Sequence, residues 1–164
     1  MINLQAKSPN LLVIGDLMID HYLWGSCELI SPEAPVQVIN VETESTMLGG
    51  AGNVINNLKA LGAQVDVISV VGNCKTSVEL KKLLSDIEVD TKYLITQKNR
   101  ITSKKSRIIA AQQQVVRYDR ESIDEINIES QSIIINTFKK VIENYEVILL
   151  SDYGKGVLTK KLTQ

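Results

Sequence analysis

The chain has 164 residues, a size that fits one ordinary domain or a part of a larger one. With 44% hydrophobic and 23% charged residues, its composition is that of a globular protein and excludes general disorder. The net charge is −1 and aromatic residues make up only 4%, so the sequence predicts no nucleic-acid binding.

The first ten residues lack the apolar core of a signal peptide and lead directly into a strand. No apolar run approaches the ~20 residues that a membrane-spanning helix needs, so no membrane partner is expected. Cys27 and Cys74 lie far apart and form no CxxC motif. We therefore expect a reduced, cytoplasmic protein.

The first predicted element is a buried parallel strand over residues 11–14, which ends at Gly15 and Asp16. Ligands of open α/β sheets bind at such carboxyl ends. Asp16 and Asp20 follow the strand, and an ionised carboxylate accepts hydrogen bonds from a polyol. Helix capping is the alternative for either residue alone, but two carboxylates at one strand end favour a binding site.

Prolines mark the next segment, residues 28–41. Pro32 and Pro35 interrupt it, and Val36, Val38 and Val41 then bracket polar residues. Because proline cannot donate a hydrogen bond to a central strand, the segment predicts edge or outlying strands.

A glycine-rich segment, Gly49-Gly50-Ala51-Gly52, precedes a helix predicted from about Asn53 that Gly62 ends. Closely spaced glycines let a ligand approach the backbone, and helix N-terminal N–H groups favour oxygen-rich or anionic ligands. The spacing fits neither a Walker A loop nor the dinucleotide fingerprint. A tight turn before a core helix explains these glycines equally well.

The remaining elements alternate between strands and helices. Strands are predicted over 65–71, 91–96 and 147–150, and helices over 76–84 and 126–141. This alternation predicts an α/β fold with a parallel sheet. The apolar residues expected on the buried helix faces are Val54, Ile55, Leu58, Leu61, Val78, Leu80, Leu83, Leu84, Ile134, Phe138, Val141 and Ile142.

A hairpin is predicted from segments 107–110 and 115–118, which flank three glutamines. Lys105 and Arg107 alternate onto one strand face, where they would clamp a phosphate, and Arg117 follows the turn. A solvated edge strand that uses lysines against aggregation is the alternative, and without other information we favour it.

Asp152 and Lys155 follow the last strand in the sequence SDYGKG, again at a carboxyl end. An ordinary turn between strand and helix is the alternative reading of this segment. No histidine and cysteine spacing predicts a metal site. Residues 158–164 begin a helix, and a sheet that stops here leaves one edge exposed, so we expect a fragment.

Five blocks together resemble the ribokinase-like (PfkB) carbohydrate kinases, and within them the kinases of D-glycero-β-D-manno-heptose 7-phosphate. The blocks are LLVIGDLMIDHYLWG, ISPEAPVQV, LGGAGNVINNLKALGA, RITSKKSRIIAAQQQVVRYDRE and LLSDYGKGVLT, in the order of the family. The resemblance covers nearly the whole chain. It implies a Rossmann-like parallel sheet with a small β lid made by about residues 28–41 and 105–118. It also implies that the lid forms a homodimer contact.

The same resemblance implies roles for individual residues. Asp16 and Asp20 would meet sugar hydroxyls, and Gly49, Gly50 and Asn53 would meet further hydroxyls. Lys105 and Arg107 match the basic pair near the substrate phosphate. Arg117, Asp152 and Lys155 match motif positions without a specific assigned role.

The family also implies ATP and Mg²⁺ as cofactors, but its Gly-Ala-Gly-Asp segment, which carries the general base, does not occur in residues 1–164. We therefore expect an acceptor-sugar portion of a kinase that is inactive alone, because phosphoryl transfer needs the aligned nucleotide. Another sugar kinase of this family, a non-catalytic sugar-phosphate binding module and an unstable fragment remain alternatives.

Overall fold

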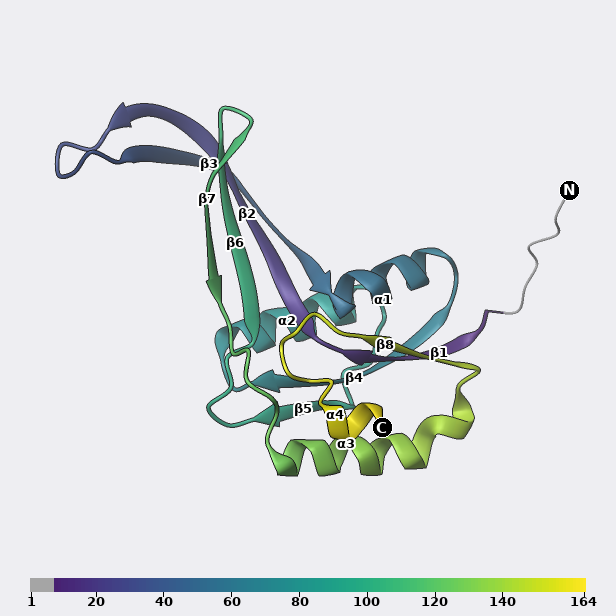
Figure 1. Cartoon of the computed structure of the whole chain (residues 1–164). Coiled ribbons are helices and arrows are strands. Elements are labelled where there is room, and N and C mark those ends of the chain that lie inside the picture. Colours follow the sequence, from purple (N-terminus) through teal and green to yellow (C-terminus); the bar gives the residue numbers. More distant parts are fainter. Residues whose placement is uncertain (1–7) are drawn as a thin grey trace, which may run out of the picture.

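The computed structural model describes residues 8–164 (Figure 1). The first seven residues, where the sequence shows no signal-peptide core, lie outside the described residues. In residues 8–164 no helix is long and apolar enough to cross a membrane.

A four-stranded parallel sheet forms the body of the molecule. Its strands are β1 (Asn10–Gly15), β4 (Gln64–Gly72), β5 (Leu94–Gln97) and β8 (Val147–Ser151), in the order β5-β4-β1-β8. The central strand β1 pairs with β4 on one side and with β8 on the other. All four strands were predicted, and β5 and β8 form the two edges of the sheet.

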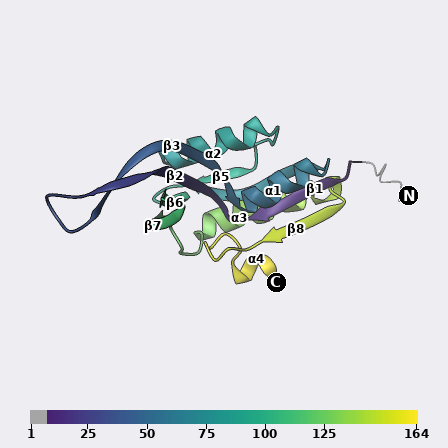
Figure 2. The same ribbon diagram turned by 90° about the horizontal axis from the view of Figure 1, so that it is seen from above.

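Helices cover both faces of this sheet (Figures 1 and 2). Helices α1 (Ala51–Ala60) and α2 (Lys75–Asp86) pack on the face of Leu11 and Val13. On the opposite face, Leu12 and Ile14 pack under α3 (Ile128–Val141), which is followed by η1 (Ile142–Asn144) and later by α4 (Lys160–Thr163). Because successive residues of a strand point to opposite faces, a continuously apolar strand suits a sheet buried on both sides.

A second sheet projects from the body as a lid (Figure 1). It contains β2 (Leu17–Ile30), β3 (Gln37–Gly50), β6 (Ser103–Ala110) and β7 (Gln113–Arg120), in the order β3-β2-β6-β7. Strands β2 and β6 run parallel, whereas β2–β3 and β6–β7 are antiparallel hairpins. The fold is therefore the expected α/β arrangement of a parallel sheet with a β lid.

The lid strands are longer than the sequence predicted. The first hairpin extends from Leu17 to Gly50, whereas the sequence predicted a lid segment only over 28–41. Residues near the body pack on both faces of β2 and residues near the tip are exposed on both, so the strand has no consistent alternation of apolar and polar residues. Consequently Asp20 lies within a lid strand and not in a loop after β1.

Helical periodicity correctly predicted that Ile55, Leu80 and Leu84 are buried, but its predictions for three other residues were wrong. Leu61 is 84% exposed at the end of α1, where Gly62 takes a positive φ of 89° and ends the helix as predicted. Val78 is 69% exposed on the outer face of α2, and Ile142 lies exposed beyond α3. Each was assigned to a buried face from spacing alone, which does not show where the packed face ends.

The β6–β7 turn also lies earlier than predicted. Ala111 and Gln112 form it, with φ of 49° and 63°, and not the three glutamines. Two successive positive φ values are typical of a type I′ turn, whose twist matches that of the strands.

Candidate functional site

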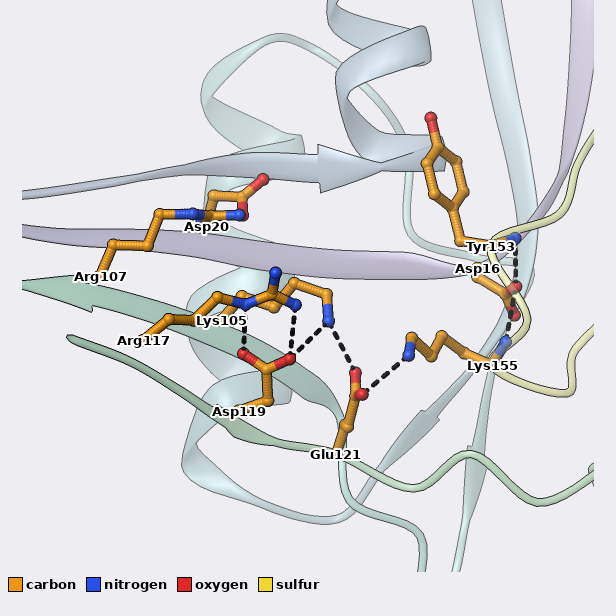
Figure 3. A network of polar contacts seen from close by, with 9 residues as sticks. All are labelled: Asp16, Asp20, Lys105, Arg107, Arg117, Asp119, Glu121, Tyr153 and Lys155. Atoms are coloured by element: carbon orange, nitrogen blue, oxygen red, sulfur yellow. Dashed lines mark hydrogen bonds and ion pairs between the residues drawn. The ribbon is translucent and has the colours of Figure 1, made fainter. Parts of the chain in front are cut away.

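One face of the lid gathers charged side chains from three strands (Figure 3). Asp20 comes from β2, Lys105 and Arg107 from β6, and Arg117 and Asp119 from β7. The residues of β6 and β7 are two apart along their strands, so alternation directs them to the same side. In the strand register, Asp20 of β2 lies beside Lys105 of β6, and Lys105 lies beside Asp119 of β7. The charged side chains of the three strands therefore form one row, called the charged row below.

Asp20 and Arg107 form an ion pair in which Arg107 Nη1 donates to Asp20 Oδ1 over 2.5 Å. Both side chains are 20% exposed, so the pair is partly shielded but open to a ligand. The guanidinium also lies 5.2 Å from the ring centre of Tyr22, within cation–π range. Gly49 lies against the same carboxylate, since a Cβ on Gly49 would lie 2.3 Å from Asp20 Oδ2.

Asp119 is held by two cations from neighbouring strands. Arg117 donates to it through Nε at 2.9 Å and Nη2 at 2.6 Å, and Lys105 Nζ donates at 2.9 Å. The hydrogen bonds from Arg117 and the charge of Lys105 hold the pKa of Asp119 well below its usual value. Lys105 and Arg107 share a face as predicted, but each already contacts a carboxylate.

Glu121 connects the lid to the body. Its Oε2 accepts from Lys105 Nζ at 3.3 Å, and its Oε1 accepts from Lys155 Nζ at 2.7 Å (Figure 3). Burial acts to raise the pKa of Glu121, but the hydrogen bonds from Lys155 and Lys105 outweigh it, so the pKa lies below its usual value. Lys155, predicted from the SDYGKG motif, thus joins the row of lid charges.

Asp16 occupies a different environment from the one the resemblance implied. It is 1% exposed, and its oxygens accept from the backbone N–H groups of Tyr153 at 2.8 Å, Lys155 at 3.0 Å and Val157 at 3.1 Å. Its backbone carbonyl accepts from the N–H of Ala51, the first residue of α1. This geometry favours a role in shaping the loop after β8 over direct contact with a sugar.

Three further predicted residues lie outside the charged row. Gly50 ends β3 with φ of 56°, and a Cβ there would lie 2.6 Å from the carbonyl oxygen of Asp16, so the close approach requires glycine. Asp152 is exposed and accepts from the N–H of Gly154 at 2.8 Å, which stabilises its own loop. Asn53 is exposed and lines a groove of about 220 Å³ between α1 and α2.

Sequence reasoning missed Asp119, Glu121 and Arg100. The alternation of Arg117, Asp119 and Glu121 at every second position was an available signal for the first two. Arg100 has no such local signal. It is 7% exposed and donates to the backbone carbonyls of Asp124, at 3.1 Å, and Lys155.

The charged row fits an acceptor that carries both hydroxyls and a phosphate. Carboxylates such as Asp20 accept from hydroxyls, and the guanidinium and ammonium groups provide donors for an anion. Within residues 8–164 no group of three or more His, Cys, Asp or Glu side chains is placed to hold a metal ion.

Comparison with known proteins relates the whole chain to sugar kinases. The model of the pfkB family carbohydrate kinases matches residues 8–163. The chain is 67% identical to the bifunctional protein HldE of Aliarcobacter butzleri, in an alignment that covers 97% of this chain and 33% of the relative. It is 57% identical to HldE of Sulfurimonas denitrificans over 98% of the chain and 34% of the relative. The chain thus spans about a third of the length of these curated relatives.

Solved structures share the fold at low sequence identity. A carbohydrate kinase from Agrobacterium tumefaciens aligns with a TM-score of 0.64 and 17% identity, over 87% of this chain and 45% of that one. Arabidopsis thaliana ribokinase, complexed with ribose and ATP, aligns with a TM-score of 0.56 and 17% identity, over 88% of this chain and 45% of the ribokinase chain. The chain belongs to the pfkB family of carbohydrate kinases.

Proposed function

We propose that the protein containing this chain is a kinase of D-glycero-β-D-manno-heptose 7-phosphate, and that this chain binds the acceptor sugar. The whole protein would transfer the γ-phosphoryl group of ATP, with Mg²⁺, to O1 of the sugar, in the synthesis of ADP-heptose for the lipopolysaccharide core. The observation that carries the proposal is the combination, on one lid face, of the Asp20 carboxylate with the cations Lys105, Arg107 and Arg117. The identity to HldE proteins supports this choice of sugar within the family.

The residues described here would act by binding and orienting the acceptor. Asp20 would accept hydrogen bonds from sugar hydroxyls, and the lid cations would hold the 7-phosphate, with Arg107 able to form two parallel bonds. The lid would also exclude water from the bound sugar. We assign the positioning of ATP and Mg²⁺, and the proton acceptor, to the rest of the protein, because residues 1–164 contain no Gly-Ala-Gly-Asp segment.

The lid also supports a proposal about assembly. Several of its apolar side chains are exposed, among them Trp24 (44%), Val36 (57%), Val38 (43%) and Val115 (41%). Such apolar surface on a projecting sheet is normally covered in a protein that stays in solution. We propose that the lids of two copies pack together in a homodimer.

The function is tested with the full-length protein, ATP, Mg²⁺ and a panel of sugars. Phosphorylation of heptose 7-phosphate at O1, identified by ³¹P NMR, is expected at a much higher kcat/KM than for ribose or fructose 6-phosphate. A higher kcat/KM for another sugar would refute the choice of substrate and leave the family assignment intact. Saturable heptose 7-phosphate binding without turnover would instead identify a sugar-phosphate binding protein.

A further inference from the structure

Glu121 is the first residue after β7, where the lid returns to the body. Its side chain is 14% exposed and accepts from two ammonium groups that belong to different parts of the fold. Lys105 comes from lid strand β6, and Lys155 comes from the loop that follows β8 of the body (Figure 3). A single carboxylate therefore links the lid to the body loop.

Lys155 is fixed at three points. Its backbone N–H donates to Asp16 at 3.0 Å, its backbone carbonyl accepts from Arg100, and its Nζ donates to Glu121 at 2.7 Å. Its side chain is only 16% exposed. A lysine side chain normally samples many rotamers, so these contacts hold the ammonium group in one position before any ligand arrives.

Lys105 is fixed in a similar way by Asp119 and Glu121, and its side chain is 11% exposed. Each ammonium group has three N–H donors. Lys155 uses one of them on Glu121 and Lys105 uses two on its carboxylates, so both retain donors for an anionic ligand.

An exposed surface salt bridge contributes little to stability. The ion pairs of Glu121 are not exposed in this way. Two poorly exposed lysines share one carboxylate, and without its negative charge the ammonium groups would repel each other in partly desolvated surroundings. Loss of the charge of Glu121 would therefore separate the lid strand from the loop after β8.

The geometry assigns to Glu121 the role of a positioning residue, which holds Lys105 and Lys155 as one pair so that a phosphorylated acceptor contacts both at once. This inference rests on the proposed function only for the identity of that acceptor. Glu121 itself needs no contact with the sugar. Its effect on binding passes through the two lysines.

The test compares Glu121→Gln with a matched control, Glu79→Gln, in the full-length protein. Glu79 on α2 pairs with Lys104 Nζ at 3.1 Å, so it also joins the lid to the body. Lys104 precedes Lys105 and points to the opposite face of β6, away from the charged row. Both variants remove one carboxylate charge from a pair between lid and body, but only Glu121→Gln affects the proposed site.

The first readout is backbone hydrogen exchange of residues 152–158 without ligand, which requires no catalytic activity. Glu121→Gln should speed exchange in this loop several-fold, because the loop loses its attachment to the lid, whereas Glu79→Gln should leave it at the wild-type rate. Equal exchange in this loop for Glu121→Gln and wild type would overturn the inference, even if the sugar assignment proved wrong.

The second readout is steady-state kinetics. Glu121→Gln should raise the KM for heptose 7-phosphate about tenfold to a hundredfold, the range expected for a lost charge-assisted hydrogen bond, and leave the KM for ATP unchanged. Glu121→Asp keeps the charge, so its KM for heptose 7-phosphate should lie between those of wild type and Glu121→Gln. If the Gln variant does not fold, the Asp variant is compared with wild type instead. Equal increases in both KM values, or no change in either, would overturn the positioning role. Absence of wild-type turnover would instead refute the proposed function and leave the exchange test valid.

Discussion

Gly49→Ala should weaken binding of the acceptor sugar although it adds only one methyl group. The new Cβ would lie 2.3 Å from Asp20 Oδ2 and 3.0 Å from Met18 Cγ. A carbon and an oxygen normally approach no closer than about 3.3 Å, so the carboxylate must move by about 1 Å. Such a shift breaks the 2.5 Å contact between Asp20 and Arg107.

The expected loss of binding free energy depends on how exposed the Asp20–Arg107 ion pair is. Both side chains are 20% exposed, so the pair lies between exposed pairs, worth less than about 1 kcal/mol, and buried ones. We take a loss of about 1–2 kcal/mol in binding free energy, which corresponds to roughly a 5- to 30-fold higher Kd for heptose 7-phosphate. Gly49 does not have a positive φ, so alanine adds no backbone strain, and the free energy of unfolding should fall by no more than the lost ion pair, about 1–2 kcal/mol.

Isothermal titration calorimetry on the full-length protein measures the Kd, and chemical denaturation measures stability. Gly62→Ala serves as the control. A Cβ there meets nothing within 4 Å, but its φ of 89° disfavours alanine, so it should lose about 1–2 kcal/mol of stability and keep the wild-type Kd. The two substitutions should therefore separate an effect on binding from an effect on stability.

A double-mutant cycle decides whether Gly49→Ala acts through Asp20. In an Asp20→Ala background the carboxylate is absent, so the added methyl group meets only Met18 Cγ, at 3.0 Å, and should change the Kd much less than it does in the wild type. A further loss equal to that in the wild-type background would refute the steric reasoning.

Three further predictions concern the lid and the chain as a whole. Arg107→Lys keeps the charge but loses the bidentate guanidinium, so it should raise the KM for heptose 7-phosphate more than that for ATP; equal effects on both would contradict a role at the sugar phosphate. Light scattering of the full-length protein should show a dimer, and Val38→Glu should shift it toward monomer because it places a charge on the apolar lid surface; a wild-type monomer at micromolar concentration would refute lid-mediated assembly. Residues 1–164 alone should release no ADP from ATP in the presence of heptose 7-phosphate and Mg²⁺, because they contain no Gly-Ala-Gly-Asp segment; turnover above a no-protein control, in material free of host kinases, would overturn this.

Stability should also fall at acidic pH through Glu121. Its pKa in the folded protein lies below the usual value of 4.5, so its stabilising contribution is present above that pH and is lost as the pH falls through the lowered pKa. The difference in the free energy of unfolding between wild type and Glu121→Gln, from denaturation curves at pH 6 and at about pH 3, should therefore be smaller at the lower pH. A stability difference that stays the same at both values would contradict the ion-pair assignment.

Local sequence patterns determined the body of this protein. Strands β1 and β4 were recognisable because a strand covered by helices on both faces is apolar at nearly every position. Strand β8 shows the same apolar run, although Val147 and Leu150 are about half exposed at the edge of the sheet. Gly62 ended α1 where expected, because only glycine readily takes the left-handed backbone conformation that follows a helix. The motif order also identified the family and placed Asp20, Lys105 and Arg107 among the candidate site residues.

Only the tertiary structure decided which of these residues contact one another. Asp16 and Asp20 are four residues apart and look alike in the sequence, yet one is enclosed by the loop after β8 and the other pairs with Arg107 on the charged face of the lid. Glu121 gave no distinct signal because its partners, Lys105 and Lys155, lie 16 and 34 residues away in opposite directions along the chain. Periodicity reports which face of its own strand or helix a side chain occupies, whereas these contacts depend on how the lid and the body sheet pack together, and that packing is a property of the whole fold.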